Sequence, residues 1–142
     1  MAVAYFDSSA FVKLLVDEDG SEIAAILWDE ADAVVSSRLA HPEVTAALAA
    51  ARRNHRLTDA AERQAQTSWE AFWAATRVVE LTPAIGDNAV ALCARLPLSG
   101  ADAVHLGSAL ALAAADTIMV TWDARLATGS LAAGLTVAPR VA

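Results

Sequence analysis

Short β-type runs alternate with helical periods along almost the whole chain, and this alternation limits the possible folds more than any other feature. The strand-like runs are Ala2–Phe6, Ala33–Val35, Val78–Leu81, Ile118–Thr121 and Leu135–Val137. Strands that alternate with helices predict a parallel sheet covered on both faces. We therefore expect an α/β fold, a three-layer α/β/α sandwich with a mainly parallel central sheet.

Between these runs, apolar residues recur at the spacing of an amphipathic helix. Phe11, Leu14 and Leu15 begin this pattern at i, i+3 and i+4. The helices predicted after that first one lie near Ile23–Leu27, then over Leu39–Arg53, Thr58–Thr76, Thr82 to about Leu96, Ala101–Ala115 and from Asp123–Ala127. The aromatic residues at 69, 72 and 73 share one helix face, which favours a core or interface position over base stacking.

Length and composition indicate one globular domain over residues 1–142. Apolar residues make up 56% of the chain and charged residues 19%, which excludes an intrinsically disordered chain. Cys93 is the single cysteine, so no internal disulfide framework is possible. That usage fits a reducing compartment, and no targeting segment is visible, so we expect a cytoplasmic protein. We expect Cys93 itself to be a buried, small apolar residue.

The net charge of −7 disfavours a uniformly basic nucleic-acid binder, but it is compatible with an acidic pocket that holds cations. The most apolar stretch is Ala103–Trp122, where His105, Ser108 and Asp116 interrupt the run. We interpret this stretch as a buried helix followed by a strand, and we expect no membrane contact.

Four acidic residues occupy positions that this architecture brings to one edge of the sheet. Asp7 and Asp123 follow strands, and Glu43 and Asp102 lie in the first turns of helices. Each has an ordinary structural explanation, as a helix cap or as a partner of the helix dipole. If the four converge, their repulsion is costly, and a Mg²⁺ or Mn²⁺ ion offsets it because hard cations prefer carboxylate oxygens.

Other chemistries find less support in the sequence. Ser8 and Ser9 lack an obvious His/Asp relay, and the three histidines are too scattered for a zinc site. No GxxxxGK[ST] loop or GxGxxG turn is present, which disfavours nucleotide cofactors. A phosphotransfer enzyme with Asp7 as nucleophile is an alternative, but its common form has a second Asp where Ser9 stands.

Four segments occur in order along the chain: YFDSSAFVKLL, PEVTAAL, GADAVHLGSAL and VTWDARL. Together they resemble the PIN domain, and in particular the VapC-type toxins of bacterial toxin–antitoxin pairs. The resemblance runs from Ala4 to the terminal GLTVAP. It implies an acidic quartet of catalytic and metal-binding residues, which falls on Asp7, Glu43, Asp102 and Asp123. It also places hydroxyl groups beside the acids, at Ser8 and Thr121. Asp116 is the rival for the fourth acid, but it precedes its strand and belongs at the opposite edge.

The resemblance implies a Mg²⁺-dependent endoribonuclease, with Mn²⁺ as a substitute, that cleaves RNA and is neutralised by a cognate antitoxin protein. It also implies a homodimer. A PIN-fold nuclease of RNA processing without a toxin role is one alternative, and a non-catalytic binding module is another. Such a module has no need for four converging acids, so the quartet favours the enzyme.

Two further features have open interpretations. Arg52, Arg53 and Arg56 lie at the far end of the helix that begins near Glu43, where they would contact RNA or antitoxin, or only complement the helix dipole. His105 lies three residues after Asp102 on the same helix face. A packed helix histidine is the favoured interpretation, and contact with the acidic site is the alternative.

Overall fold

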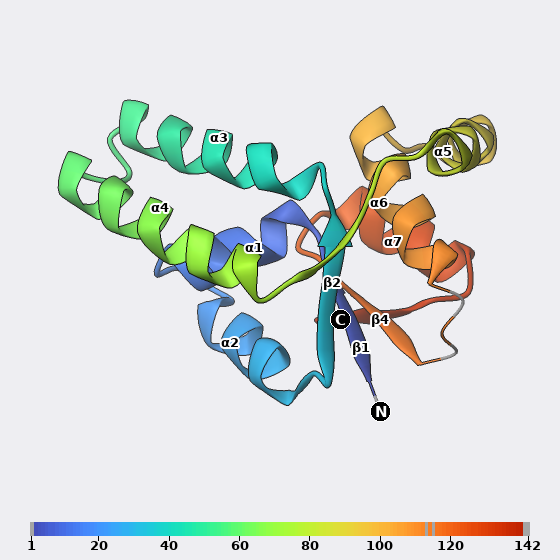
Figure 1. Cartoon of the computed structure of the whole chain (residues 1–142), viewed down its shortest axis with the longest axis horizontal. Helices are drawn as coiled ribbons and strands as arrows, with labels where there is room; N and C mark the ends of the chain where they lie inside the picture. Colours follow the sequence, from blue (N-terminus) through green and yellow to red (C-terminus); the bar gives the residue numbers. More distant parts are fainter. Residues whose placement is uncertain (1, 113, 115, 141–142) are drawn as a thin grey trace.

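Five strands form one sheet in which every neighbouring pair is parallel (Figure 1). This computed structural model describes residues 2–112, 114 and 116–140. In chain order the strands are β1 (Val3–Phe6), β2 (Ala33–Ser37), β3 (Arg77–Val79), β4 (Thr117–Val120) and β5 (Thr136–Ala138). Their order across the sheet is β3-β2-β1-β4-β5.

Helices cover both faces of this sheet. They are α1 (Ser8–Leu15), α2 (Ser21–Glu30), α3 (Ala40–Arg53), α4 (Asp59–Ala74), α5 (Pro83–Arg95), α6 (Gly100–Ala111) and α7 (Ala124–Ala132). Figure 1 shows α1 to α4 on one side of the sheet and α5 to α7 on the other. The predicted three-layer α/β/α sandwich is confirmed, and its sheet is parallel throughout the described residues.

The core is divided by the pleat of the sheet, since successive side chains of a strand point to opposite faces. On β1, Phe6 packs into the cluster with α1, α3 and α4, whereas Tyr5 packs into the cluster with α5, α6 and α7. Both side chains are fully buried. Each buried aromatic residue of this kind contributes about 1.5–3 kcal/mol, so β1 holds the two layers together.

The aromatic residues of α4 belong to the core, as predicted from their spacing. Trp69 is fully buried, and its ring lies 4.8 Å from that of Phe11 and 5.4 Å from that of Trp73. Trp28 of α2 closes the cluster against Phe72, with ring centroids 4.9 Å apart. These contacts pin α4 and α2 onto α1.

Five helices begin with a side chain that accepts a hydrogen bond from a backbone N–H three residues later. The capping residues are Asp7, Thr58, Thr82, Ser99 and Asp123. Such a cap satisfies one of the free N–H groups at a helix start. Asp7 and Asp123 therefore start α1 and α7 directly after strands β1 and β4.

Two predictions were wrong in detail. The sixth helix was predicted to reach Ala115, but α6 ends at Ala111, and residues 113 and 115 lie outside the described part of the chain. Cys93 is exposed rather than buried. The buried side of α5 is formed by Ile85, Ala89 and Leu92, and Cys93, next to Leu92, falls outside that stripe.

The apolar stretch of residues 103–122 divides between α6 and β4, as predicted. Within the residues that the structure describes, no helix has the length and apolar character needed to cross a membrane.

Gly20 packs against Trp122, the residue before Asp123, and provides a test of this contact. It has φ of +96°, and a Cβ there would lie 2.7 Å from Nε1 of Trp122. We expect Gly20→Ala to lower the free energy of unfolding by about 1–3 kcal/mol, since it adds both backbone strain and overpacking. The matched control is Gly86→Ala in α5, where a Cβ meets nothing within 4 Å. Urea denaturation should show this control stabilised, by roughly 0.5–1 kcal/mol; equal effects at both positions would contradict the packing.

Candidate active site

The order of the strands places the switch point of the sheet between the carboxyl ends of β1 and β4. From β1 the chain proceeds to β2 and β3 on one side, and β4 and β5 lie on the other. Open parallel sheets bind ligands at such a switch point. Phe6 pairs with Val120 at the ends of the two strands, so Asp7 and Thr121 follow side by side.

Asp7 lies at this switch point and is almost completely buried, with 4% of its surface exposed. Its Oδ1 accepts hydrogen bonds from Ser9 Oγ (2.7 Å) and the Ala10 N–H (2.9 Å), and its Oδ2 accepts one from Thr121 Oγ1 (2.6 Å). Burial raises the pKa of Asp7 above its usual range, although these hydrogen bonds oppose the rise. The site therefore favours added positive charge.

Glu43 reaches the same edge from the first turn of α3. Its Oε1 accepts hydrogen bonds from Ser8 Oγ (2.6 Å) and from His105 Nε2 (2.7 Å). Burial opposes ionisation, but the hydrogen bonds from His105 and Ser8 outweigh it and lower the pKa of Glu43. Its carboxyl group is therefore held ionised and directed by two neighbours.

Asp102 and Asp123 complete the acidic edge. Asp102 lies in the first turn of α6, and its N–H donates to Ser99 Oγ. Burial raises the pKa of Asp102, and the negative charges of Asp123 and Glu43 raise it further. Asp123 and Glu43 are thus each close enough to repel Asp102. The Asp123 N–H donates to Thr121 Oγ1 (3.0 Å), so one hydroxyl group links Asp123 to Asp7.

The structure brings the four predicted acids to one edge, and each also has its ordinary structural role. Asp7 and Asp123 cap helices, and Glu43 and Asp102 lie in first turns. Ser8 and Thr121 each donate to one of the acids, as the resemblance implied. Asp116 precedes β4 and lies at the opposite edge. Among the described residues, no three acid, histidine or cysteine side chains already stand in the arrangement of a metal site.

His105 contributes more than a packed helix histidine. It is 2% exposed, and it contacts both Glu43 and the hydroxyl group of Tyr5. The sequence signal for the first contact is the three-residue spacing from Asp102, which places both side chains on one face of α6. The contact with Tyr5 joins residues 100 positions apart and has no local signal.

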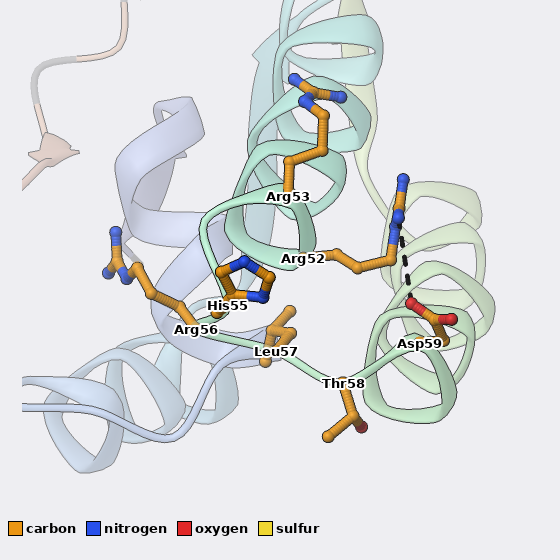
Figure 2. Close-up of a pocket in the computed structure, with 7 residues that line it drawn as sticks. All are labelled: Arg52, Arg53, His55, Arg56, Leu57, Thr58 and Asp59. Atoms are coloured by element: carbon orange, nitrogen blue, oxygen red, sulfur yellow. Dashed lines mark ion pairs between the residues drawn. The ribbon is translucent and has the colours of Figure 1, made fainter.

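The three arginines line an open hollow at the other end of α3, as Figure 2 shows. Arg52 lies 3.4 Å from Glu62 and 3.8 Å from Asp59, and Arg56 lies 3.5 Å from Glu18. Arg53 is exposed and makes no ion pair within the described residues. Ten residues of helix separate Arg53 from Glu43, which is about 15 Å along the axis. The hollow is therefore separate from the acidic edge.

The sequence model of the PIN domain matches residues 4–128. This chain belongs to the PIN domain family. Ribonuclease VapC45 and Ribonuclease VapC49, from two strains of Mycobacterium tuberculosis, are each 56% identical to it over 139 residues. These matches cover 98% of this chain and 96% of each relative. The resemblance to VapC-type PIN domains is confirmed.

Solved structures share the fold of this PIN domain. VapC20 from Mycobacterium tuberculosis, a Sarcin-Ricin loop cleaving toxin, has a TM-score of 0.69 at 19% identity. That match covers 94% of this chain and 96% of VapC20. A toxin-antitoxin complex from Klebsiella pneumoniae has a TM-score of 0.61 at 19% identity, with 84% of this chain and 86% of that chain covered. At these identities the likeness shows the fold alone.

The burial of Asp7 predicts how the metal-free protein responds to pH. A carboxyl group whose pKa is raised by folding destabilises the folded state once it ionises, so its effect appears as pH rises through the raised pKa. We expect metal-free Asp7→Asn to melt above the wild type at neutral pH, and the gap to close in acid. The exposed Asp87→Asn serves as control. Thermal scans that show Asp7→Asn less stable at every pH would contradict this account.

Proposed function

We propose that this PIN domain is a divalent-metal-dependent endoribonuclease that acts as the toxin of a toxin–antitoxin pair. The observation that carries the proposal is the acidic edge, where Asp7 is buried at the switch point and where burial, with the charges of two further acids, raises the pKa of Asp102. The two relatives at 56% identity are named ribonucleases and match nearly the full chain. An acidic edge on this fold supports the same chemistry.

The donor set suits a hard divalent cation. Ribonucleases of this family depend on a divalent metal ion, and carboxylate oxygens are the ligands that Mg²⁺ and Mn²⁺ prefer. We assign Mg²⁺, with Mn²⁺ as a substitute, to Asp7, Asp102 and Asp123, with Glu43 beside them. A cation at this edge would remove both the cost of burying Asp7 and the repulsion at Asp102.

Each residue of the edge has a part in the reaction. When bound, the ion polarises a phosphate oxygen and lowers the pKa of a water molecule. Asp7, Asp102 and Asp123 would hold the ion, and Glu43 would orient the attacking water or hold a second ion. Thr121 and Ser8 donate hydrogen bonds that keep Asp7 and Glu43 in place. Hydrolysis would form a bond from the water oxygen to phosphorus and break the bond from phosphorus to the leaving oxygen opposite it.

The structure disfavours the phosphotransfer alternative. In the common form of such an enzyme a second Asp lies two residues after the nucleophile, but here that position is Ser9, whose hydroxyl group donates to Asp7 Oδ1 (2.7 Å). The same carboxyl group suits a role as a fixed metal ligand.

RNA binding by an acidic chain needs only a local basic surface, and the arginine end of α3 provides one. Arg52 and Arg56 are partly neutralised by Glu62 and Glu18, so the exposed Arg53 is the strongest candidate for a phosphate contact. An RNA strand that is cut at the acidic edge would reach Arg53 after about 15 Å along α3.

The partner we propose is a small antitoxin protein that inserts a basic side chain into the acidic edge or uses the same arginines. We also propose a homodimer. The protein would bind RNA and antitoxin in the cytoplasm. A neighbouring antitoxin gene would separate this toxin role from a role in general RNA processing.

Loss of a single metal-site charge should abolish cleavage with little change in fold. We expect Asp7→Asn and Asp102→Asn each to slow cleavage of cellular RNA by at least about 100-fold, the scale of losing one electrostatic group in a transition state. Asp116→Asn, at the opposite edge of the sheet, should cleave at nearly the wild-type rate. Full wild-type activity in excess EDTA would contradict the metal requirement.

The salt dependence of RNA binding tests the arginine surface. In an Asp7→Asn background, which prevents cutting, we expect Arg53→Ala to weaken binding and to reduce the salt slope by roughly 0.7 for one lost phosphate contact. Arg95→Ala is a matched control, because Arg95 occupies the last turn of α5 in the opposite layer. Fluorescence anisotropy over a range of salt would show this difference. An unchanged slope for Arg53→Ala would exclude the contact.

A further inference from the structure

A chain of hydrogen bonds runs from the core of the domain to one oxygen of Glu43. Tyr5 Oη lies 2.9 Å from His105 Nδ1, and His105 Nε2 lies 2.7 Å from Glu43 Oε1. Ser8 Oγ lies 2.6 Å from the same oxygen. Tyr5 and His105 are 0% and 2% exposed, so the bond between them is buried, whereas the two bonds to Glu43 are partly buried.

The donors and acceptors of this chain can be assigned in one direction. An ionised carboxylate only accepts hydrogen bonds, so His105 Nε2 and Ser8 Oγ are the donors to Glu43. In a neutral imidazole the other nitrogen then has no proton, and His105 Nδ1 accepts from the hydroxyl group of Tyr5. Tyr5 therefore favours the tautomer of His105 in which Nε2 carries the proton and donates to Glu43.

This series of hydrogen bonds joins elements from both layers of the domain. Glu43 belongs to α3, on the side of the sheet that α1 to α4 cover, whereas His105 belongs to α6 on the other side (Figure 1). Tyr5 lies on β1, between the two layers. The bond from His105 to Glu43 therefore crosses the carboxyl edge of the sheet, where the four acids gather.

The two oxygens of Glu43 have different surroundings. Oε1 accepts two hydrogen bonds, from Ser8 and His105. Oε2 accepts none from the residues that the structure describes. The terminal torsion of a glutamate is otherwise broad, so two donors on one oxygen determine where the second oxygen points.

We propose that His105, oriented by Tyr5, is a positioning residue for the nuclease reaction. Its hydrogen bond keeps Oε1 of Glu43 bound within the protein, so that Oε2 can act on the attacking water or on an ion. This inference rests on the proposed function. It adds that the two carboxylate oxygens of Glu43 have different roles. Residues that orient metal ligands in this way are commonly worth about 10–100-fold in activity or metal affinity.

Three variants test the proposal against a purely structural role. We expect His105→Leu to lower kcat by about 10–100-fold with little change in KM for RNA. His105→Gln should restore most of the rate, because an amide N–H can replace the Nε2 donor. Tyr5→Phe, which keeps the shape of the core, should cause a smaller loss. If Gln fails to rescue while the variants fold like the wild type, the positioning role is wrong.

The tautomer of His105 provides a measurement on the metal-free protein, independent of activity. Nitrogen-15 NMR at mildly alkaline pH should show a proton on Nε2 and none on Nδ1. In Tyr5→Phe the preference for this tautomer should weaken. A proton on Nδ1 alone, or on both nitrogens, would overturn the assignment.

The outcomes separate this inference from the proposed function. If the wild type cuts no RNA with Mg²⁺ or Mn²⁺, the proposed function fails, whatever the tautomer. If the wild type cuts and His105→Leu cuts equally well, only the positioning role fails. Glu70→Gln is the matched control, since it removes the exposed pair of His41 and Glu70 (3.0 Å) and should leave kcat unchanged.

Discussion

A buried carboxyl group at the end of the first strand determines what the rest of the site must provide. Asp7 is removed from water, and three hydrogen bonds hold it, but none of them brings a full positive charge. Burial therefore still raises the pKa of Asp7. The same edge of the sheet carries three further acids, and burial together with the negative charges of Asp123 and Glu43 raises the pKa of Asp102. Such an arrangement is unfavourable in isolation, and a divalent cation, as the proposed function requires, would offset its cost.

The parallel sheet makes this concentration of charge possible. Because all strands end at the same edge, residues that follow β1 and β4 become neighbours although they are more than a hundred positions apart in the chain. The helices that return over the two faces then deliver Glu43 and Asp102 from opposite layers. The hydrogen bond between His105 and Glu43 joins those layers at the same edge. The fold and the site thus depend on the same contacts.

Much of this organisation could be predicted from the sequence because its signals are local. Alternating strands and helices predicted the layers, and an acid directly after a strand predicted both a helix cap and a residue at the edge. Other features depend on tertiary contacts. The pairing of Tyr5 with His105 follows from how α6 packs on β1, the exposure of Cys93 from which stripe of α5 faces the core, and the neutralisation of Arg52 from the position of α4. The spacing of apolar residues in the sequence carries no information about these tertiary contacts.

The central claim is that the four acids form one cation site at the switch point of the sheet. Anomalous diffraction from crystals of the wild-type protein soaked in Mn²⁺ tests it most directly. We expect an anomalous peak within ligand distance of Asp7 and Asp102, at about 2.0–2.2 Å for a six-coordinate ion of this kind, and no such peak in crystals of Asp7→Asn. A Mn²⁺ ion bound only elsewhere on the protein, or an equal peak in the variant, would contradict it. In that case the acids would be helix caps and dipole partners alone.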